Sequence, residues 1–154
     1  MSKRTIEQEI RYTWLLISKM YNEEAEKFGG SMTVGFALLS LNPKEPIPST
    51  SLGPKMGMES TSLSRTLKFM EEESLIERLP NPDDGRGILI KLTKRGIDYR
   101  NYAKDQVMKF NKTIIGDLGE EAINNFLHVI IDFFEYSLCF PNSYIKTSSS
   151  SWWS

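Results

Sequence analysis

The spacing of the apolar residues changes from helical to alternating in one region of this chain, and that region constrains the fold more than any other feature. Residues 75–79 and 88–92 read as short strands, and alternate positions of the second strand carry isoleucine or leucine. Between them, residues 80–87 contain the string NPDDG, which is dense in turn-forming residues. The longer patterned stretches on either side have helical spacing instead. The sequence therefore predicts a mainly α chain with one small β-hairpin.

Six helical patterns surround the hairpin, and capping or breaking residues mark most of their ends. Ser31 and Thr93 stand where each can cap a helix, and the pair Gly29-Gly30 stands where a helix ends. A segment with three prolines, residues 43–48, reads as a rigid loop. The predicted helices are residues 5–28, 31–41, 51–56, 60–73, 93–115 and 120–140, and residues 116–119 are expected to separate the last two.

Pro54 lies within the short helix at residues 51–56, where a proline in the helix interior would cost about 3 kcal/mol. The cost is avoided if the helix begins near Ser51, because Pro54 then falls in the first turn, whose N–H groups have no intrahelical acceptor. The sequence therefore predicts a late start for this helix, which Gly57 ends.

The composition fits one soluble globular domain in a reducing compartment. The chain has 154 residues, of which 40% are apolar and 25% charged. A single cysteine, Cys139, rules out an intrachain disulfide. Residues 1–9 are polar and charged, unlike a signal peptide, and residues 126–140 are too few and too charged to span a bilayer. We therefore expect a cytoplasmic protein with no membrane partner.

Charge is unevenly distributed, although the formal net charge is only -1. Residues 50–112 hold 12 Lys and Arg against 9 Asp and Glu, whereas residues 113–143 hold 5 acidic residues and no Lys or Arg. This modest basic excess permits nucleic-acid binding but is also what an ordinary solvated surface shows. The acidic run at residues 71–73 is interpreted as a solvated helix end.

The central elements follow the order helix, tight turn, helix, hairpin. A helix-turn-helix places its second helix in the DNA major groove, and here that helix is residues 60–73. Short hydroxyls and two cations opposite its apolar face suit phosphates and base edges. A plain amphipathic helix with a polar outer face explains the same pattern equally well. The candidate DNA-binding residues on this helix are Ser60, Thr61, Ser62, Ser64, Arg65 and Lys68.

The hairpin region carries a more specific pattern. Residues 74–96 read SLIERLPNPDDGRGILIKLTKRG, which resembles, without gaps, the wing motif GLVxRxxxPxDxRxxxLxLTxxG of the MarR family of regulators. The resemblance extends over residues 5–140. It implies a homodimeric winged helix-turn-helix transcription factor, most often a repressor, that binds a palindromic site in double-stranded DNA.

The resemblance also implies a domain organisation. A single MarR-like domain would span residues 1–146. The winged helix-turn-helix lobe would lie at about residues 31–92 and the helical dimerisation region at residues 1–30 and 93–140. The remaining tail, residues 147–154, is nearly all serine, so we expect it to be disordered.

Two residues at the hairpin tip gain roles from the resemblance. Arg86 matches the wing-tip arginine that enters the minor groove, and Asp84 matches the acid that braces this arginine. An arginine on a tight tip flanked by glycines is geometrically suited to a narrow, negatively charged groove. The plainer interpretations are a solvated turn residue for Arg86 and a turn-stabilising carboxylate for Asp84.

Three positions depart from the family motif. Ser74 stands where glycine is usual, so the left-handed turn expected there is less favourable. Leu79 and Gly85 stand where arginines are common, so this wing carries less positive charge. We therefore expect weaker non-specific DNA binding and a shallower dependence of affinity on salt.

The last predicted helix is apolar around much of its circumference, and packing against residues 93–115 would cover only one face. We therefore expect a homodimer, because a symmetric copy is the commonest cover for such a helix. In family relatives a small aromatic or amphipathic effector enters a crevice between the dimer region and the winged lobe. The corresponding candidates here are Trp14, Ile17, Tyr21, Phe36 and Tyr99, for which core packing is the alternative interpretation.

The residues do not predict an enzyme, a metal site or a cofactor. His128 is the single histidine and lies in an apolar helix, and Cys139 has no activating neighbour in sequence. No metal-ligand cluster, phosphate-binding glycine loop or nucleophile elbow appears in the sequence. The alternative left open is a winged-helix module that binds a protein instead of DNA, since positive charge is sparse.

Overall fold

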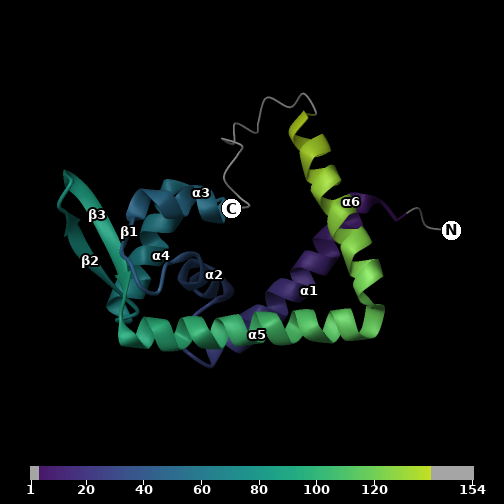
Figure 1. Ribbon diagram of the computed structural model, residues 1–154, viewed down its shortest axis with the longest axis horizontal. Coiled ribbons are helices and arrows are strands. Elements are labelled where there is room, and N and C mark those ends of the chain that lie inside the picture. The colour runs from purple at the N-terminus through teal and green to yellow at the C-terminus, as the bar shows by residue number, and fades with distance from the viewer. Residues whose placement is uncertain (1–3, 140–154) are drawn as a thin grey trace. The chain divides into compact units, whose positions relative to one another are not determined.

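A computed structural model describes residues 4–139, apart from the side chains of residues 84–86 (Figure 1). The serine-rich tail therefore lies outside the described residues. The chain divides into two compact units, Met1–Lys104 and Asp105–Ser154. The described elements are α1 (Ile6–Glu26), α2 (Met32–Ser40), β1 (Ile47–Pro48), a 3-10 turn (Ser49–Ser51), α3 (Leu52–Met56), α4 (Ser60–Glu72), β2 (Ile76–Asn81), β3 (Asp84–Leu92), α5 (Lys94–Leu118) and α6 (Glu120–Cys139). The predicted class, mainly α with a small β-hairpin, is confirmed.

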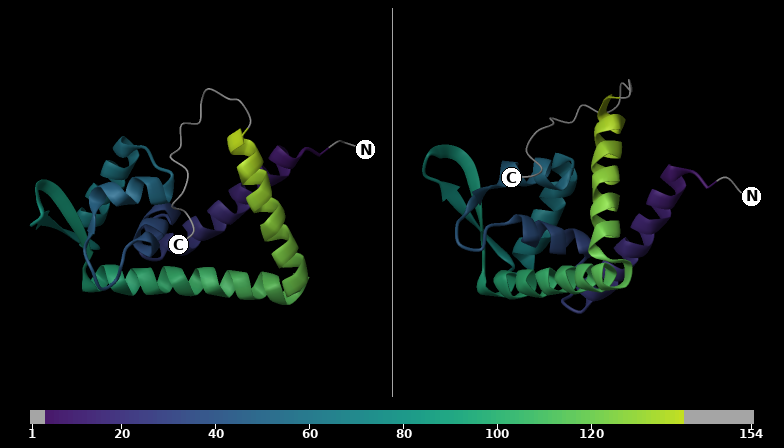
Figure 2. Two further views of the ribbon diagram at one scale, coloured as in Figure 1. Left: turned by 45° about the horizontal axis from the view of Figure 1, so that its top comes forward. Right: turned by 45° about the vertical axis from the view of Figure 1, so that its right-hand side comes forward.

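The sheet of the first unit has the strand order β1-β3-β2 and is antiparallel throughout. Ile76 pairs with Leu92 at its base, and both side chains are buried. Both views in Figure 2 show the hairpin of β2 and β3 projecting from the rest of this unit. The hairpin is therefore a wing that is anchored at its base and open at its tip.

The turn predicted at residues 80–87 is too long. The strands continue to Asn81 and from Asp84, which leaves two residues between them, and the pairing register shifts beside Pro80. Strand β2 lies at an edge of the sheet, and it tolerates proline because an outward-facing position of an edge strand needs no N–H donor. The Asn81 side chain accepts a hydrogen bond from the Asp83 N–H at 3.1 Å, so this asparagine closes the turn locally.

The loop predicted at residues 43–48 contains a strand that the sequence did not indicate. Ile47 and Pro48 pair with Ile90 and Leu89 of β3. The prolines suggested a loop because proline cannot donate to a ladder, but β1 is an edge strand where that donor is dispensable.

Buried apolar side chains from the end of α1, from α2, α3, α4 and the sheet, and from the start of α5 form the core of the first unit. Leu63, Leu67 and Met70 of α4 are all buried, as their helical spacing predicted. Ile90 and Leu92 are buried as well, whereas Ile88 on the same strand lies further out and is exposed. The polar face of α4 is therefore turned outwards by the packing of its opposite face.

The start of α3 follows the prediction made from Pro54. A 3-10 turn at Ser49–Ser51 precedes α3, so Pro54 is the third helical residue and no regular helix runs from Ile47 through it. The Ser51 side chain does not cap the helix, since its hydroxyl donates to the Pro48 carbonyl oxygen at 2.7 Å. Gly57 ends α3 with a φ of 59°.

The break predicted at residues 116–119 is confined to its last residue. Helix α5 continues through Gly116 to Leu118, and Gly119 alone adopts a left-handed conformation, with a φ of 85°. A single glycine costs a helix about 1 kcal/mol, which does not outweigh the cooperativity of a helix of 25 residues.

Helix α4 ends in a left-handed residue at Ser74, whose φ is 55°. The Leu75 N–H donates to the Met70 carbonyl oxygen at 2.8 Å, and the Ser74 N–H donates to the Glu71 carbonyl oxygen at 2.9 Å. These two bonds define a Schellman motif, which usually places glycine at the position of Ser74. The expected left-handed turn is therefore present, and Ser74 adopts it despite the steric cost of its β-carbon.

Replacing Ser74 with glycine is expected to raise the free energy of unfolding by about 1 kcal/mol, since relief of the left-handed strain exceeds the added entropy of the unfolded chain. Urea denaturation followed by circular dichroism measures the change. Ser64→Gly, at an exposed position inside α4, is the control and should lower stability by about 0.5–1 kcal/mol. If the Ser74→Gly protein were less stable than wild type, the left-handed conformation of Ser74 would not be strained.

Candidate nucleic-acid interface

The six candidate residues on α4 are all exposed, opposite a face that is buried in the core. Thr61, Arg65 and Lys68 recur at spacings of four and three residues and so form one row along the helix. The remaining three, Ser60, Ser62 and Ser64, lie at the start of the helix or beside this row. Helix α4 therefore presents a continuous polar surface whose cations lie in a single line.

The hydroxyls of this surface are not equivalent. The Ser64 hydroxyl donates to the Ser60 carbonyl oxygen at 2.8 Å, and the Thr66 hydroxyl donates to the Ser62 carbonyl oxygen at 3.0 Å. A serine whose proton is engaged in this way can still accept a hydrogen bond but must break its own to donate one. Ser64 is therefore prepared to accept a hydrogen bond from a base amino group rather than to donate one to a phosphate.

The acidic run at the end of α4 is more than a solvated helix end. Glu71 pairs with Arg78 of β2 at 2.9 Å, Glu72 pairs with Lys68 at 3.7 Å, and Glu73 pairs with Arg95 of α5 at 3.2 Å. These groups are partly exposed, so each pair stabilises the fold by no more than about 1 kcal/mol. Their larger effect is to neutralise Lys68 within the row on α4 and two cations of neighbouring elements, whereas no ion pair engages Arg65 among the described residues.

The wing adds polar and apolar groups on opposite faces. Arg78 lies across from Ile90 and so faces α4, which explains its pairing with Glu71. Glu77 and Lys91 face each other across β2 and β3 and form an ion pair at 3.2 Å. The backbone of the tip belongs to β3, but the side chains of Asp84 and Arg86 lie outside the described residues. The minor-groove role of Arg86 and the bracing role of Asp84 stay predictions.

Four of the five effector candidates come from the paired helices α1 and α2. Trp14 stacks on Phe36 with ring centroids 6.5 Å apart, and Tyr21 meets Phe36 edge-on at 6.1 Å. Ile17 is half-buried on the same helix as Trp14 and Tyr21. The three aromatic rings form one cluster, and Trp14 keeps an exposed surface within it.

Tyr99 occupies a different environment in the core. It is 2% exposed, its hydroxyl donates to the Ala25 carbonyl oxygen at 3.3 Å, and its ring stacks on Phe28 at 4.8 Å. Burial raises the pKa of the Tyr99 hydroxyl, which therefore stays protonated and able to donate. For this residue the structure has the core packing that the sequence left as an alternative.

A polar cluster beside Tyr99 was not found from the sequence. The Tyr102 hydroxyl donates to Glu24 at 2.7 Å, and the Lys27 ammonium pairs with the same carboxylate oxygen at 2.7 Å. The hydrogen bond to Glu24 raises the pKa of Tyr102 and also that of Lys27. A spacing of three residues at the end of α1 allows Glu24 and Lys27 to pair, but nothing in the sequence indicates the tyrosine from α5.

The described residues show neither a metal site nor a membrane span. No group of three or more His, Cys, Asp or Glu side chains is placed to hold a metal ion within residues 4–139. None of the helices in that range is both long and apolar enough to cross a membrane. Cys139 is exposed at the end of α6.

A helix-turn-helix followed by a hairpin that pairs with a short third strand defines the chain as a winged helix-turn-helix protein. The MarR family model matches residues 31–88, the region of this lobe. The transcriptional regulator SarZ of Staphylococcus haemolyticus is 27% identical over 124 residues, which cover 79% of this chain and 84% of SarZ. Residues 31–88 therefore match the MarR family, and the chain is similar in sequence to transcriptional regulators such as SarZ.

Solved structures agree on the fold. The complex of MepR from S. aureus with DNA matches with a TM-score of 0.76 at 20% identity, over 88% of this chain and 99% of that one. PcaV from Streptomyces coelicolor, solved with its natural ligand, matches with a TM-score of 0.73 at 15% identity, over 89% and 99%. At these identities the likeness is one of fold.

Proposed function

We propose that this protein is a sequence-specific transcriptional repressor that acts in the cytoplasm and binds a palindromic operator in double-stranded DNA as a homodimer. The observation that carries the proposal is the exposed row of Thr61, Arg65 and Lys68 on a helix whose opposite face is buried. The fold it shares with MepR, a protein solved in complex with DNA, supports it.

Each polar residue of α4 has a role that fits its chemistry. Arg65 would grip O6 and N7 of a guanine with two hydrogen bonds, and Ser64 would accept from a base amino group. Lys68 would contact a phosphate. The hydroxyls of Ser60, Thr61 and Ser62, together with the amides at the start of α4, would donate to phosphates. At the wing tip, Arg86 would enter the minor groove and be braced by Asp84.

A homodimer supplies the second recognition helix that a palindrome requires. No residue of α6 is buried, and its exposed side chains include Phe126, Leu127, Ile131 and Phe134. A contiguous apolar surface of this kind marks an interaction site, and a symmetric copy covers it on both chains at once. The two half-sites would then lie about 10 bp apart, one turn of the duplex.

A small aromatic or amphipathic effector would bind at the ring cluster of α1 and α2. Trp14, Tyr21 and Phe36 meet there, with Ile17 half-buried on the same helix, and Trp14 is partly exposed. Tyr99 would contribute only packing within the lobe, because its hydroxyl already donates to the Ala25 carbonyl oxygen. Effector binding would favour a dimer geometry that releases DNA.

One observation favours a second candidate function, a winged-helix module that binds a protein. Arg78, Lys91 and Arg95 each pair with a glutamate, so these three cations of the wing and α5 offer little free positive charge. Such a module would not need Arg65, Lys68 and Arg86 on one surface.

Fluorescence anisotropy distinguishes the two functions. Wild-type protein and Arg65→Ala and Arg86→Ala variants are titrated into duplexes from the gene's own upstream region and into scrambled duplexes, at several salt concentrations. Arg65→Ala should weaken specific binding by about 1–3 kcal/mol. Arg86→Ala should weaken binding to every sequence and make the salt slope shallower by about 1.

The matched control is Arg11→Ala, which removes an exposed arginine from α1 and should leave DNA affinity unchanged. If a folded, dimeric, ligand-free wild-type protein binds none of the duplexes at low salt, the protein-binding function replaces the proposed one.

A further inference from the structure

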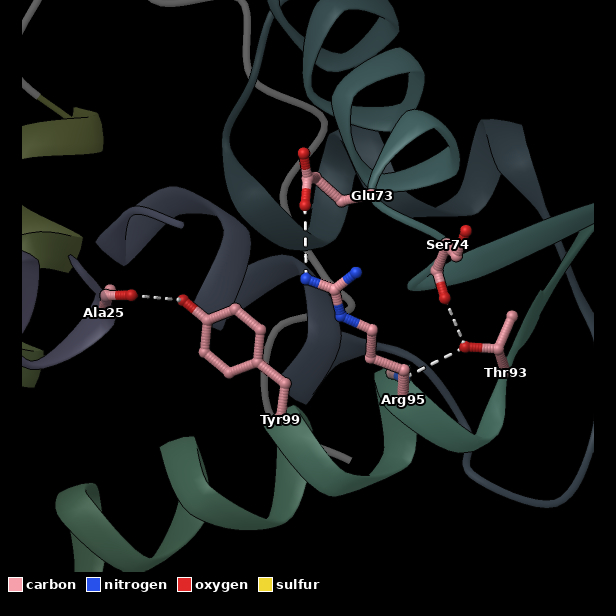
Figure 3. A network of polar contacts seen from close by, with 7 residues as sticks. Ala25, Glu73, Ser74, Thr93, Arg95 and Tyr99 are labelled. Atoms are coloured by element: carbon pink, nitrogen blue, oxygen red, sulfur yellow. Dashed lines mark hydrogen bonds and ion pairs between the residues drawn. The ribbon is translucent and has the colours of Figure 1, made fainter. Parts of the chain in front are cut away.

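Thr93 joins the two connections that meet at the base of the wing, one from α4 to β2 and one from β3 to α5 (Figure 3). Its hydroxyl donates to the Ser74 carbonyl oxygen at 2.6 Å and accepts from the Gly96 N–H at 3.0 Å. Its own N–H donates to the Leu75 carbonyl oxygen at 3.1 Å. Ser74 and Leu75 connect α4 to β2, and Thr93 connects β3 to α5, so one residue binds two consecutive carbonyls at the end of α4.

The place where the end of α4 meets the start of α5, called the joint below, is restricted by further contacts. Arg95 and Glu73 form an ion pair across it, at 3.2 Å. Gly96 has no side chain where a β-carbon would overlap the Leu75 carbonyl oxygen, so the first turn of α5 rests directly on that peptide. Ser74 holds a left-handed conformation there. Such a backbone persists only where the surroundings fix it, so the joint is held in one geometry.

We infer that the Thr93 hydroxyl is a positioning group for DNA reading, because it fixes the angle at which α4 leaves the wing. The inference rests on the proposed function of α4. Helix α4 has 13 residues and is about 20 Å long, so a tilt of about 5° at the joint moves its far end by about 2 Å. The base-reading residues lie toward that far end, and contacts to base edges fail at smaller displacements.

Thr93→Val keeps the shape of the side chain and removes only the hydroxyl. The probe is the duplex that wild-type protein recovers from a randomised library, with a scrambled duplex as reference. Thr93→Val should weaken binding to the recovered duplex by about 10-fold, equivalent to one lost bidentate base contact. Binding to the scrambled duplex should change less than about twofold, because that affinity depends on phosphate contacts. Thr93→Ser, which restores the hydroxyl, should restore discrimination between the two duplexes.

Loss of the hydroxyl also uncaps α5, so stability has to be separated from positioning. Ser74→Gly relieves strain at the same joint, and the double variant Ser74→Gly/Thr93→Val therefore recovers stability without recovering the hydroxyl. The inference requires that the double variant still bind the recovered duplex about 10-fold more weakly than Ser74→Gly alone. Equal affinities would overturn it, and so would equal losses on both duplexes. Failure of wild-type protein to recover any sequence would instead refute the proposed function itself.

Discussion

Replacing Gly96 with alanine is expected to lower the free energy of unfolding by about 3 kcal/mol, the upper end of what overpacking costs. The added β-carbon would overlap the carbonyl oxygen of Leu75. That oxygen belongs to the backbone and accepts from the Thr93 N–H at 3.1 Å, so it cannot rotate away as a side chain would. The first turn of α5 must therefore separate from the base of the wing.

Gly35 provides a matched control, because it is also a buried glycine within a helix. A β-carbon there meets only the Ala103 side chain, at an ordinary 3.9 Å. Gly35→Ala should raise stability by about 0.5–1 kcal/mol, the difference in helix propensity. Urea denaturation of the two variants measures both effects. Equal stabilities would show that a β-carbon at position 96 does not clash with the Leu75 carbonyl oxygen.

Charging the apolar face of α6 is expected to abolish the proposed homodimer and, with it, the proposed operator binding. Leu127 and Phe134 lie seven residues apart on one face and are 49% and 51% exposed. Leu127→Glu/Phe134→Glu would place four carboxylates in a two-fold interface, where unpaired buried charges cost several kcal/mol. Light scattering should report the mass of one chain, and affinity for a palindromic duplex should fall by more than about 100-fold because the second recognition helix is lost.

The control adds the same charge to the opposite face of α6, through Asn125→Glu/His128→Glu, and should leave the dimer and its DNA affinity intact. A charged-face variant that keeps twice the mass of one chain would mean that α6 does not form the dimer contact.

The sequence predicted the helices well because their ends carry residues with local roles. Thr93 caps α5 and Ser31 caps α2 through hydrogen bonds within four residues, so no knowledge of the tertiary fold was needed. Gly57 and Pro54 likewise act through their own covalent structure, because glycine permits the left-handed conformation that ends α3 and proline fixes φ. The exposed residues of α4 followed from the same periodicity, since the buried face fixes the opposite one.

The features that sequence reasoning missed depend on partners distant in the chain. Strand β1 exists only because Ile47 and Pro48 lie beside β3, and no local pattern favours it over a loop. The acidic run at the end of α4 looked solvated because two of its partners, Arg78 and Arg95, come from other elements. For Tyr99 the sequence left an effector site and core packing open, because its partners Phe28 and Ala25 lie far away in the chain.

The three glutamates at the end of α4 have a consequence for how a DNA-binding protein of this kind searches for its site. Glu71, Glu72 and Glu73 each engage a cation, so the long-range field that draws a repressor onto any duplex is weakened. On the proposed function, the protein would spend less time sliding along unrelated DNA and would reach its operator mainly by three-dimensional diffusion. Fewer copies would then be sequestered by the rest of the chromosome, so a smaller cellular pool would keep one operator occupied.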